Sequence, residues 1–269
     1  MTELVGPGNV RVLFLGDVFG KPGRKAVQRQ LPRIASREQA SFVIANCENV
    51  SAGAGVDRRG VEALLEAGVD VLTSGNHIWR RPEAFPLVDG VERLLRPANY
   101  PAGAPGRGWG VFESSDGFRL GIVNLIGRVF MEPVDCPFAT VEALLTGPLA
   151  SCPVIVDMHA EASSEKAAMG WFLAGRAAAV LGSHTHVQTA DERLLPGGTA
   201  YVSDAGMCGP RDSVIGSKPD VVVQRFRSRL PAPLEVASGP VLVQGVVVEI
   251  ERASGKAVGI ERVQELVES

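Results

Sequence analysis

The sequence predicts an α/β fold in which short buried strands alternate with helices and carry polar residues at their carboxyl ends. Three observations support this class. Short β-branched and apolar runs, such as residues 10–15, stop abruptly at polar residues. Helical patterns separate several of these runs, as in a sheet with helices on its faces. Each of the four histidines follows an apolar run, which places the imidazoles where open α/β sheets bind their ligands.

The first part of the chain contains strands predicted at residues 10–15, 42–45 and 69–72. A helical pattern opens at residues 20–24, and Pro32 is expected to kink or split it. A second helix is predicted at residues 58–67, where Gly68 suits its end. The loop at residues 51–55 is flexible by composition, and it lacks the Gly-Lys-Ser/Thr ending of a phosphate-binding loop.

The remaining elements are read from the same patterns. Loops with short helices are expected at residues 80–110, where prolines and glycines are frequent. Strands are predicted at 110–112 and 118–125 around a turn at 114–117, and then at 154–156, 177–181, 199–203, 241–250 and 258–266, the last two as an antiparallel pair. Helices are predicted at 141–145, 163–174 and 218–227, the last one exposed and preceded by a loop at 204–216. No repeat or linker divides the chain, so residues 1–269 are expected to form a single domain.

Composition and charge narrow the class of protein. With 45% hydrophobic and 21% charged residues, the chain has the composition of an ordinary soluble globular protein. The formal net charge of -3 argues against a general nucleic-acid binder, but it allows a small anionic substrate at a local positive site. No run approaches the ~18 apolar residues of a membrane span, residues 1–11 lack a signal-peptide pattern, and the cysteines lack CxxC spacing. We therefore expect a cytoplasmic protein with reduced thiols and no membrane partner, and its oligomeric state stays open, a homo-oligomer included.

The segment Gly-Ser-His-Thr-His at residues 182–186 carries the strongest functional signal. It directly follows the apolar run at 177–181. In a strand, residues i and i+2 point to the same side, so His184 and His186 leave this end in one direction. Imidazole is the commonest protein ligand for metals, and two parallel imidazoles suit a metal site better than separate packing roles.

Polar residues at the ends of the other predicted strands complete a candidate metal site. The full set is Asp17, Glu48, Asn49, Asn76, His77, His159, His184 and His186. Strand ends converge at one edge of an α/β sheet, so these segments can meet there. Mixed imidazole, carboxylate and amide ligands suit Mn, Fe(II) or Zn better than Mg or Ca. The set is too large for one tetrahedral zinc, which favours two metal ions.

The order of these motifs resembles the metallophosphoesterase superfamily, whose pattern runs Asp-x-His, Gly-Asp-x-x-Asp, Gly-Asn-His, a lone His and Gly-His-x-His. The chain departs from this pattern at three places. Phe19 stands where a histidine ligand is usual, Glu48 replaces the bridging aspartate with Asn49 beside it, and Ser183 precedes His184.

With these departures, the chain resembles one branch of the superfamily, the bacterial YmdB-type phosphodiesterases. The segments that carry the resemblance are GDVFGKPGR, NCENVSAG, TSGNHIW, DMHAEASSEK, GSHTHVQTAD and MCGPRDSVIG. They run from about residue 12 to about residue 221, and the last fifty residues or so carry little of the match. The resemblance implies a four-layer α/β/β/α sandwich with a di-iron or di-manganese centre that hydrolyses 2′,3′- or 3′,5′-cyclic nucleotides.

The resemblance also implies a role for each residue of the set. Asp17, Asn49 and His186 are expected to hold the first metal ion, and Asn76, His159 and His184 the second. Glu48 is expected to bridge the two ions, and His77 to act as the general acid while a hydroxide shared by the ions attacks. Two divalent ions, two carboxylates and one hydroxide leave a net charge of about +1, which suits a singly charged phosphodiester.

Two other functions stay open at this point. The same metals can serve a phosphomonoesterase or nucleotidase, because the ligand set indicates phosphate-ester hydrolysis better than it indicates which ester. A non-catalytic scaffold that binds protein partners is the other alternative, and the intact His77 argues against it. Arg24, Arg128 and Arg211 lie in predicted loops from which they can approach a phosphate, although ordinary surface arginines fit the same pattern.

One residue beside the candidate ligands is expected to play no part in metal binding. Cys47 alternates away from Glu48 in an extended segment, so we expect a packed thiol and not a ligand.

Overall fold

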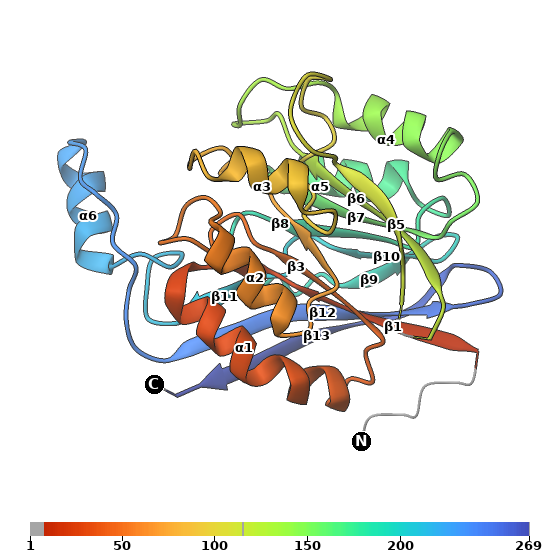
Figure 1. Ribbon diagram of the computed structural model, residues 1–269, viewed down its shortest axis with the longest axis horizontal. Coiled ribbons are helices and arrows are strands. Elements are labelled where there is room, and N and C mark those ends of the chain that lie inside the picture. Colours follow the sequence, from red (N-terminus) through yellow and green to blue (C-terminus); the bar gives the residue numbers. More distant parts are fainter. Residues whose placement is uncertain (1–7, 115, 269) are drawn as a thin grey trace.

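The computed structural model describes residues 8–114 and 116–268 and arranges them in four layers, with helices on the outer faces of two packed sheets (Figure 1). The first layer contains α1 (Gly20–Arg37), α2 (Arg58–Glu66) and α3 (Ala84–Gly90), and the last contains α4 (Pro137–Thr146) and α5 (Ser163–Phe172). The structure thus confirms the predicted α/β/β/α sandwich.

The first sheet follows the order β2-β11-β12-β1-β3-β4, and β13 also pairs with β12. The strands are β1 (Asn9–Leu15), β2 (Asp17–Val18), β3 (Phe42–Asn46), β4 (Val71–Thr73), β11 (Met207–Pro210), β12 (Val241–Glu251) and β13 (Ala257–Val267). β1, β3 and β4 run parallel to one another, so their carboxyl ends lie at the same edge. β12 and β13 form the predicted antiparallel pair.

The second sheet follows the order β5-β6-β7-β8-β10-β9. Its strands are β5 (Trp109–Glu113), β6 (Arg119–Ile126), β7 (Val154–His159), β8 (Ala179–Ser183), β9 (Arg193–Leu195) and β10 (Thr199–Val202). β6, β7, β8 and β10 are parallel, whereas β5 and β9 are antiparallel edge strands. The carboxyl ends of β7 and β8 therefore also lie together.

The period of two along β1 explains how a strand joins two layers. Leu13 and Leu15 belong to an apolar cluster with residues of α1, whereas Val12 and Phe14 belong to the cluster between the sheets. All four side chains are buried. A strand that is covered on both faces reads as a continuous apolar run, which is why residues 10–15 were recognisable in the sequence.

Helix α1 runs through Pro32 without the expected break. Proline removes one backbone donor and therefore leaves the carbonyl of Gln28 without its helical partner. Both Gln28 and Pro32 are exposed, so water can bond the released carbonyl. Leu31 and Ile34, on either side of Pro32, pack into the core and hold the helix in place.

Other expectations were met to different extents. The loop-rich region at 80–110 contains α3, and the exposed helix predicted at 218–227 is α6 (Pro219–Ser228). The sequence did not predict β2, β9 and β11, because strands of two to four residues are too short to show a period. Residue 115 of the predicted turn and residues 1–7 of the segment examined for a signal peptide lie outside the described residues.

Helix α6 stands apart from the four layers (Figure 1). It belongs to a segment, residues 211–240, that leaves the first sheet after β11 and returns to it at β12; we call this segment the α6 arm. Backbone hydrogen bonds tie its base together, from Lys218 N to the Glu235 carbonyl and from Ala237 N to the Gly216 carbonyl. No helix among residues 8–114 and 116–268 is both long and apolar enough to cross a bilayer.

Candidate metal centre

The structure brings all eight residues of the predicted set together at the edge that the two sheets share. From the first sheet, Asp17 follows β1, Glu48 and Asn49 follow β3, and Asn76 and His77 follow β4. From the second sheet, His159 is the last residue of β7, and His184 and His186 follow β8. Segments that are distant in the sequence thus converge because parallel strands end at one edge.

Glu48 lies in the middle of this cluster and is fully buried. Its Oε1 accepts a hydrogen bond from Asn49 Nδ2 at 3.1 Å and lies 3.2 Å from Nδ1 of His77. Its Oε2 accepts from the backbone N–H of His77 at 2.8 Å and lies 3.3 Å from Nε2 of His159. The two carboxylate oxygens therefore face two different groups of side chains.

Asp17 is the second buried carboxylate of the cluster. Its Oδ2 accepts from the backbone N–H of His184 at 3.0 Å. Its Oδ1 lies 3.8 Å from Nε2 of His186 and has no hydrogen-bond donor among the described residues. An unpaired buried carboxylate oxygen is costly, so this atom calls for a cation or another donor.

Each of the three imidazoles that the second sheet contributes has one ring nitrogen held by a group outside the cluster. His159 Nδ1 lies 2.9 Å from Ser183 Oγ, and His186 Nδ1 donates to the carbonyl of Ile215 at 2.9 Å. His184 Nε2 lies 3.1 Å from a carboxylate oxygen of Glu161. Such outer partners fix the orientation of metal-binding histidines in proteins and leave the other nitrogen free for a metal.

The inward nitrogens lie close to one another. His184 Nδ1 and His159 Nε2 are 3.1 Å apart, and Asn76 Oδ1 is also 3.1 Å from His159 Nε2. On the other side of Glu48, Asn49 Nδ2 lies 3.1 Å from His186 Nε2. Ligand atoms of Glu48, His159 and His184 lie within 4.8 Å of one another.

The backbone around these histidines is held in an uncommon conformation. His184 has φ 98° and His186 has φ 64°, in the left-handed region that side chains with a Cβ seldom adopt. Thr185 fixes the turn, because its N–H and its hydroxyl both donate to Asp204 Oδ2, at 3.0 and 2.8 Å. Strain of this kind costs about 1–3 kcal/mol per residue and is concentrated at functional sites.

Gly75 allows the cluster to close. A Cβ at this position would collide with the imidazole of His159 and the carboxylate of Glu48. The Gly-Asn-His segment thus needs glycine because the backbone after β4 passes directly beside the inward-facing groups.

Burial and mutual contacts shift the pKa values of the cluster in opposite directions. Burial alone would lower the pKa of His159, but the carboxylates of Glu48 and Asp17 raise it to about 9. Burial opposes ionisation of Glu48, yet the contacts with His159 and His77 hold its pKa well below the usual range. Burial raises the pKa of Asp17, whereas burial and the neighbouring His159 lower the pKa of His184 to about 3. A neutral imidazole beside buried carboxylates is a suitable metal ligand.

A polar network behind the cluster joins the two sheets, and sequence reasoning missed it. Asp157 Oδ2 accepts from Thr73 Oγ1 at 2.5 Å and from Asn46 Nδ2 at 3.0 Å, both in the first sheet. Asp157 Oδ1 accepts from Ser183 Oγ at 2.6 Å, and this hydroxyl also contacts His159. Burial raises the pKa of Asp157 to about 6. The sequence does contain a signal for this network, because Asp157 is a charged residue in an otherwise apolar strand, two positions before His159.

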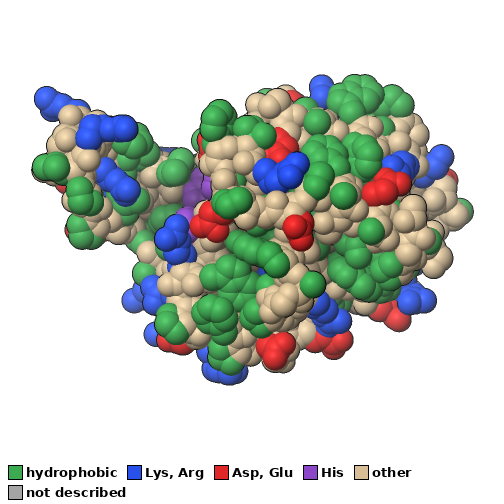
Figure 2. Space-filling view, turned by 90° about the horizontal axis from the view of Figure 1, so that it is seen from above, with side chains coloured by type: hydrophobic (Ala, Val, Ile, Leu, Met, Phe, Trp, Pro, Cys, Tyr) green, Lys and Arg blue, Asp and Glu red, His purple; other side chains and the backbone are tan. Residues whose placement is uncertain are grey.

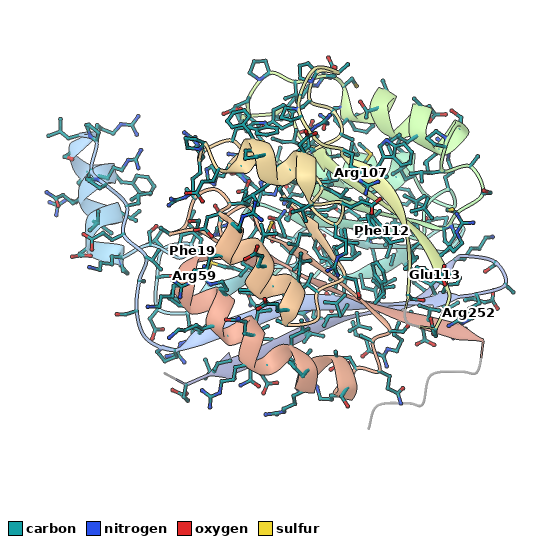
Figure 3. All side chains as sticks on the ribbon, in the orientation of Figure 1. Phe19, Arg59, Arg107, Phe112, Glu113 and Arg252 are labelled. Carbon is teal, nitrogen blue, oxygen red and sulfur yellow. The ribbon has the colours of Figure 1, made fainter. Side chains whose placement is uncertain are left out.

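Phe19, at the position where the superfamily pattern has histidine, packs against the cluster. Its ring meets the imidazole of His186 edge-on, with centroids 5.6 Å apart. It lies on the side of the molecule from which the α6 arm projects (Figure 3). Gly216, with φ 101°, passes so close that a Cβ there would collide with the ring. Phe19 thus acts as an apolar wall that positions His186.

A cavity of about 780 Å³ opens beside the cluster. Asn49, His77 and His186 line its inner end, and residues of the α6 arm line the opposite wall. Figure 2 shows histidine side chains in the hollow between the arm and the rest of the molecule. His77 Nδ1 lies 2.7 Å from Asn49 Oδ1.

None of the arginines proposed from the sequence lines this cavity. Arg24 lies inside α1 and not in a loop, and it is buried. Arg128 is exposed, and Arg211 forms an ion pair with Asp212 through two hydrogen bonds. The arginine that lies beside His77 in the cavity wall is Arg80, which sequence reasoning did not single out.

The cysteines behave as expected. Among them, Cys47 is buried in the apolar cluster under α1 and α2. Burial raises the pKa of its thiol, so the metal-binding thiolate form is disfavoured. All four cysteines are free thiols.

Comparisons with known proteins agree with this fold. The chain is 44% identical over 255 residues to a Bacillus subtilis protein named 2′,3′-cyclic-nucleotide 2′-phosphodiesterase, covering 94% of this chain and 96% of that protein. A crystal structure of a hypothetical protein from Thermus thermophilus matches with a TM-score of 0.90 and 42% identity, over 97% of this chain and 100% of that one. A crystal structure of a novel phosphatase from Mycoplasma pneumoniae matches with a TM-score of 0.90 and 33% identity, over 99% and 96%.

These relatives and the two-sheet fold place the chain in the class of hydrolases that cleave phosphate esters. The chain belongs to the YmdB-like family, whose model matches residues 13–263. The match extends beyond the segment up to about residue 221 on which the sequence resemblance depended. The predictions of the family and of an enzyme are therefore confirmed.

Proposed function

We propose that the chain hydrolyses cyclic-nucleotide phosphodiesters at a centre of two divalent transition-metal ions, iron or manganese. The observation that carries this proposal is the convergence of two fully buried carboxylates with three outward-anchored imidazoles, where Asp17 Oδ1 has no donor in the described part of the chain. The name of the Bacillus subtilis relative supports the 2′,3′-cyclic substrate.

The donor atoms fit two ions better than one. Asp17, Asn49 and His186 form one group, and Asn76, His159 and His184 form the other. Glu48 directs one carboxylate oxygen to each group, as a bridging ligand would. In the structure, Asn49 directs Nδ2 toward His186. Its side-chain amide must therefore make a half-turn for the oxygen to face a metal ion. When bound, two such ions polarise the phosphate and supply a hydroxide at neutral pH.

His77 is the residue that we assign to proton donation. Its Nδ1 lies 3.2 Å from Glu48 Oε1, and its ring lines the cavity. No described residue is bonded to its Nε2, so this nitrogen can protonate the departing ribose oxygen. General acids of this kind typically contribute ~10²- to 10⁴-fold in rate.

The substrate test uses protein purified without chelator and supplied anaerobically with Mn(II) or Fe(II). We expect turnover of 2′,3′-cyclic nucleotides, tested alongside 3′,5′-cyclic nucleotides and monoesters, and a kcat/KM for bis-p-nitrophenyl phosphate above that for p-nitrophenyl phosphate. The expected net charge near +1 favours a monoanionic diester. Faster turnover of the monoester indicates a phosphomonoesterase instead. No hydrolysis of any cyclic nucleotide with the metals restored would contradict the proposal.

A further inference from the structure

The cavity beside the cluster is bounded on its far side by one face of α6. Val222, Arg225 and Phe226 of α6 line the cavity at i, i+3 and i+4, and Arg229, the residue directly after the carboxyl end of α6, lines it too. Residues at this spacing share one side of a helix. The arm therefore turns two guanidinium groups and one aromatic ring toward the space in front of the cluster.

The arginines that line the cavity have no anionic partner in the described part of the chain. Across residues 8–114 and 116–268, no carboxylate forms an ion pair with Arg80, Arg225 or Arg229. Arg225 and Arg229 are exposed, and Arg80 lies beside His77. Guanidinium groups that converge on a cavity without carboxylates suit phosphate, which they bind with paired N–H donors.

A cyclic mononucleotide does not account for these charges. It carries a single negative charge, and that charge belongs at the cluster in the proposed function. Arg225 and Arg229 on the opposite wall then face no phosphate. A substrate with further phosphates along a chain supplies the missing partners.

The cavity also contains aromatic surface. Phe19 and Phe226 both line it, one on the body and one on the arm. A positively charged groove combined with aromatic rings is the usual way in which proteins bind single-stranded nucleic acid without sequence preference. The formal net charge of -3 does not oppose this, because the binding charges are local to one wall.

We propose that the substrate is the end of a short single-stranded oligonucleotide, with its terminal cyclic phosphodiester at the cluster and the preceding phosphate at Arg225 and Arg229. This inference rests on the proposed function of the cluster. In the reaction, one water adds its oxygen to phosphorus, one P–O bond of the five-membered ring breaks, and the departing ribose oxygen takes a proton. The internal phosphodiester is bound and not cleaved.

A second copy of the chain is the alternative occupant of this face. Among the exposed apolar side chains of the α6 arm, Val223 and Leu230 do not line the cavity, whereas Ile215, Phe226 and Leu234 do. The face toward the cluster thus combines cationic, aromatic and aliphatic side chains, and its unpaired arginines favour a phosphate ligand. Self-association through the arm is therefore an outcome to be distinguished by the experiment.

The test compares adenosine 2′,3′-cyclic phosphate with adenylyl-adenosine ending in a 2′,3′-cyclic phosphate. We expect kcat/KM to be about tenfold or more higher for the dinucleotide, because a hydrogen-bonded charge pair contributes on that scale. In the double variant Arg225→Ala/Arg229→Ala this ratio should fall close to one. Arg227→Ala is the matched control, because Arg227 is an exposed arginine of α6 that does not line the cavity. It should leave the ratio unchanged.

Binding gives a second readout that does not depend on turnover. A 5′-labelled dinucleotide with a 3′-phosphate, followed by fluorescence anisotropy, should bind about tenfold more weakly to the double variant than to Arg227→Ala. The difference should shrink as salt rises, because phosphate contacts are screened.

The outcomes separate the two proposals. If the wild-type chain cleaves neither substrate but the double variant loses dinucleotide binding, the proposed function fails and the binding inference stands. If the mononucleotide is cleaved and both the ratio and the binding are the same in the double variant, the inference is overturned. A changed oligomeric state in light scattering, with an unchanged ratio, would identify the face as a contact between copies of this chain.

Discussion

The two sheets contribute different chemistry to the cluster at their shared edge. The strand ends of the first sheet carry oxygen donors, the carboxylates of Asp17 and Glu48 and the amides of Asn49 and Asn76. The strand ends of the second sheet carry the imidazoles of His159, His184 and His186. The first sheet therefore supplies the negative charge, and the second supplies imidazoles with fixed orientation.

The cluster therefore depends on how the two sheets pack against each other. Neither sheet alone offers the mixed oxygen and nitrogen donors that the proposed transition-metal centre needs. The network of Asp157 with Thr73 and Asn46 holds the sheets in register directly behind the cluster. Substitutions in the first sheet should change activity by changing the charge of the cluster. Substitutions in the second sheet should change it by moving the imidazoles.

Glu48→Gln should have the largest effect, because it removes the negative charge that faces both groups of side chains. We expect kcat/KM for 2′,3′-cyclic AMP to fall roughly 10⁴-fold or more, which corresponds to about 5.5 kcal/mol of transition-state stabilisation. Steady-state kinetics with metals restored measure this. Glu62→Gln, an exposed position paired with Arg58, is the control and should behave as wild type. A decrease in kcat/KM of less than tenfold in Glu48→Gln would show that this carboxylate is not essential for the reaction.

His77→Ala tests the one imidazole that comes from the side of the first sheet. We expect both metals and the fold to be kept, while kcat for an alkoxide leaving group falls by ~10²- to 10⁴-fold. The loss should be smaller for p-nitrophenolate, which needs little protonation to leave. Loss of metal from the variant would make His77 a ligand. An equal loss for both leaving groups would make it a phosphate-positioning residue.

Asp157→Asn tests how the second sheet fixes the orientation of its imidazoles. The substitution leaves the hydroxyls of Thr73 and Ser183 without a charged acceptor, so His159 loses its fixed orientation. We expect metal affinity to fall by about 10- to 100-fold and the free energy of unfolding by about 2–3 kcal/mol. Metal titration and urea denaturation measure the two effects.

Asp191→Asn is the matched control for Asp157. Asp191 also accepts hydrogen bonds from two hydroxyls, those of Thr189 and Ser203, but it contacts no residue of the cluster. Its substitution should lower stability and leave metal affinity unchanged. Equal loss of metal affinity in both variants would mean that Asp157 acts only through global stability.

Cys47→Ala should have the smallest effect, although it lies next to Glu48. Its thiol packs under α1 and α2, away from the cluster. We expect a cost of about 1–2 kcal/mol in the free energy of unfolding from the lost packing, with kcat/KM changed less than about twofold. A large loss of metal would show that the thiol is a ligand.

The sequence predicted the cluster residues because each follows a strand that is buried on both faces and therefore reads as an apolar run. Residues 10–15 and 177–181 show this most clearly. The four layers themselves followed from the family resemblance, since periodicity does not tell which sheet a strand joins.

What the sequence did not predict depends on contacts between the layers. Asp157 is recognisable as a buried charge, but its partners Thr73 and Asn46 lie in the other sheet and share no motif with it. Arg80 and Arg225 are ordinary surface arginines in the sequence, and only the position of the α6 arm places both at one cavity. Sequence reasoning therefore found the groups that mark strand ends and missed those that a packing geometry brings together.

The proposed two-metal centre is best tested by measuring the metal content of the chain, purified anaerobically and never exposed to chelator. A centre built from the oxygen ligands of one sheet and the imidazoles of the other should hold two transition-metal ions per chain. Glu48→Gln, prepared in the same way, should show lower occupancy of both. Full occupancy by only one ion per wild-type chain would contradict the two-metal centre.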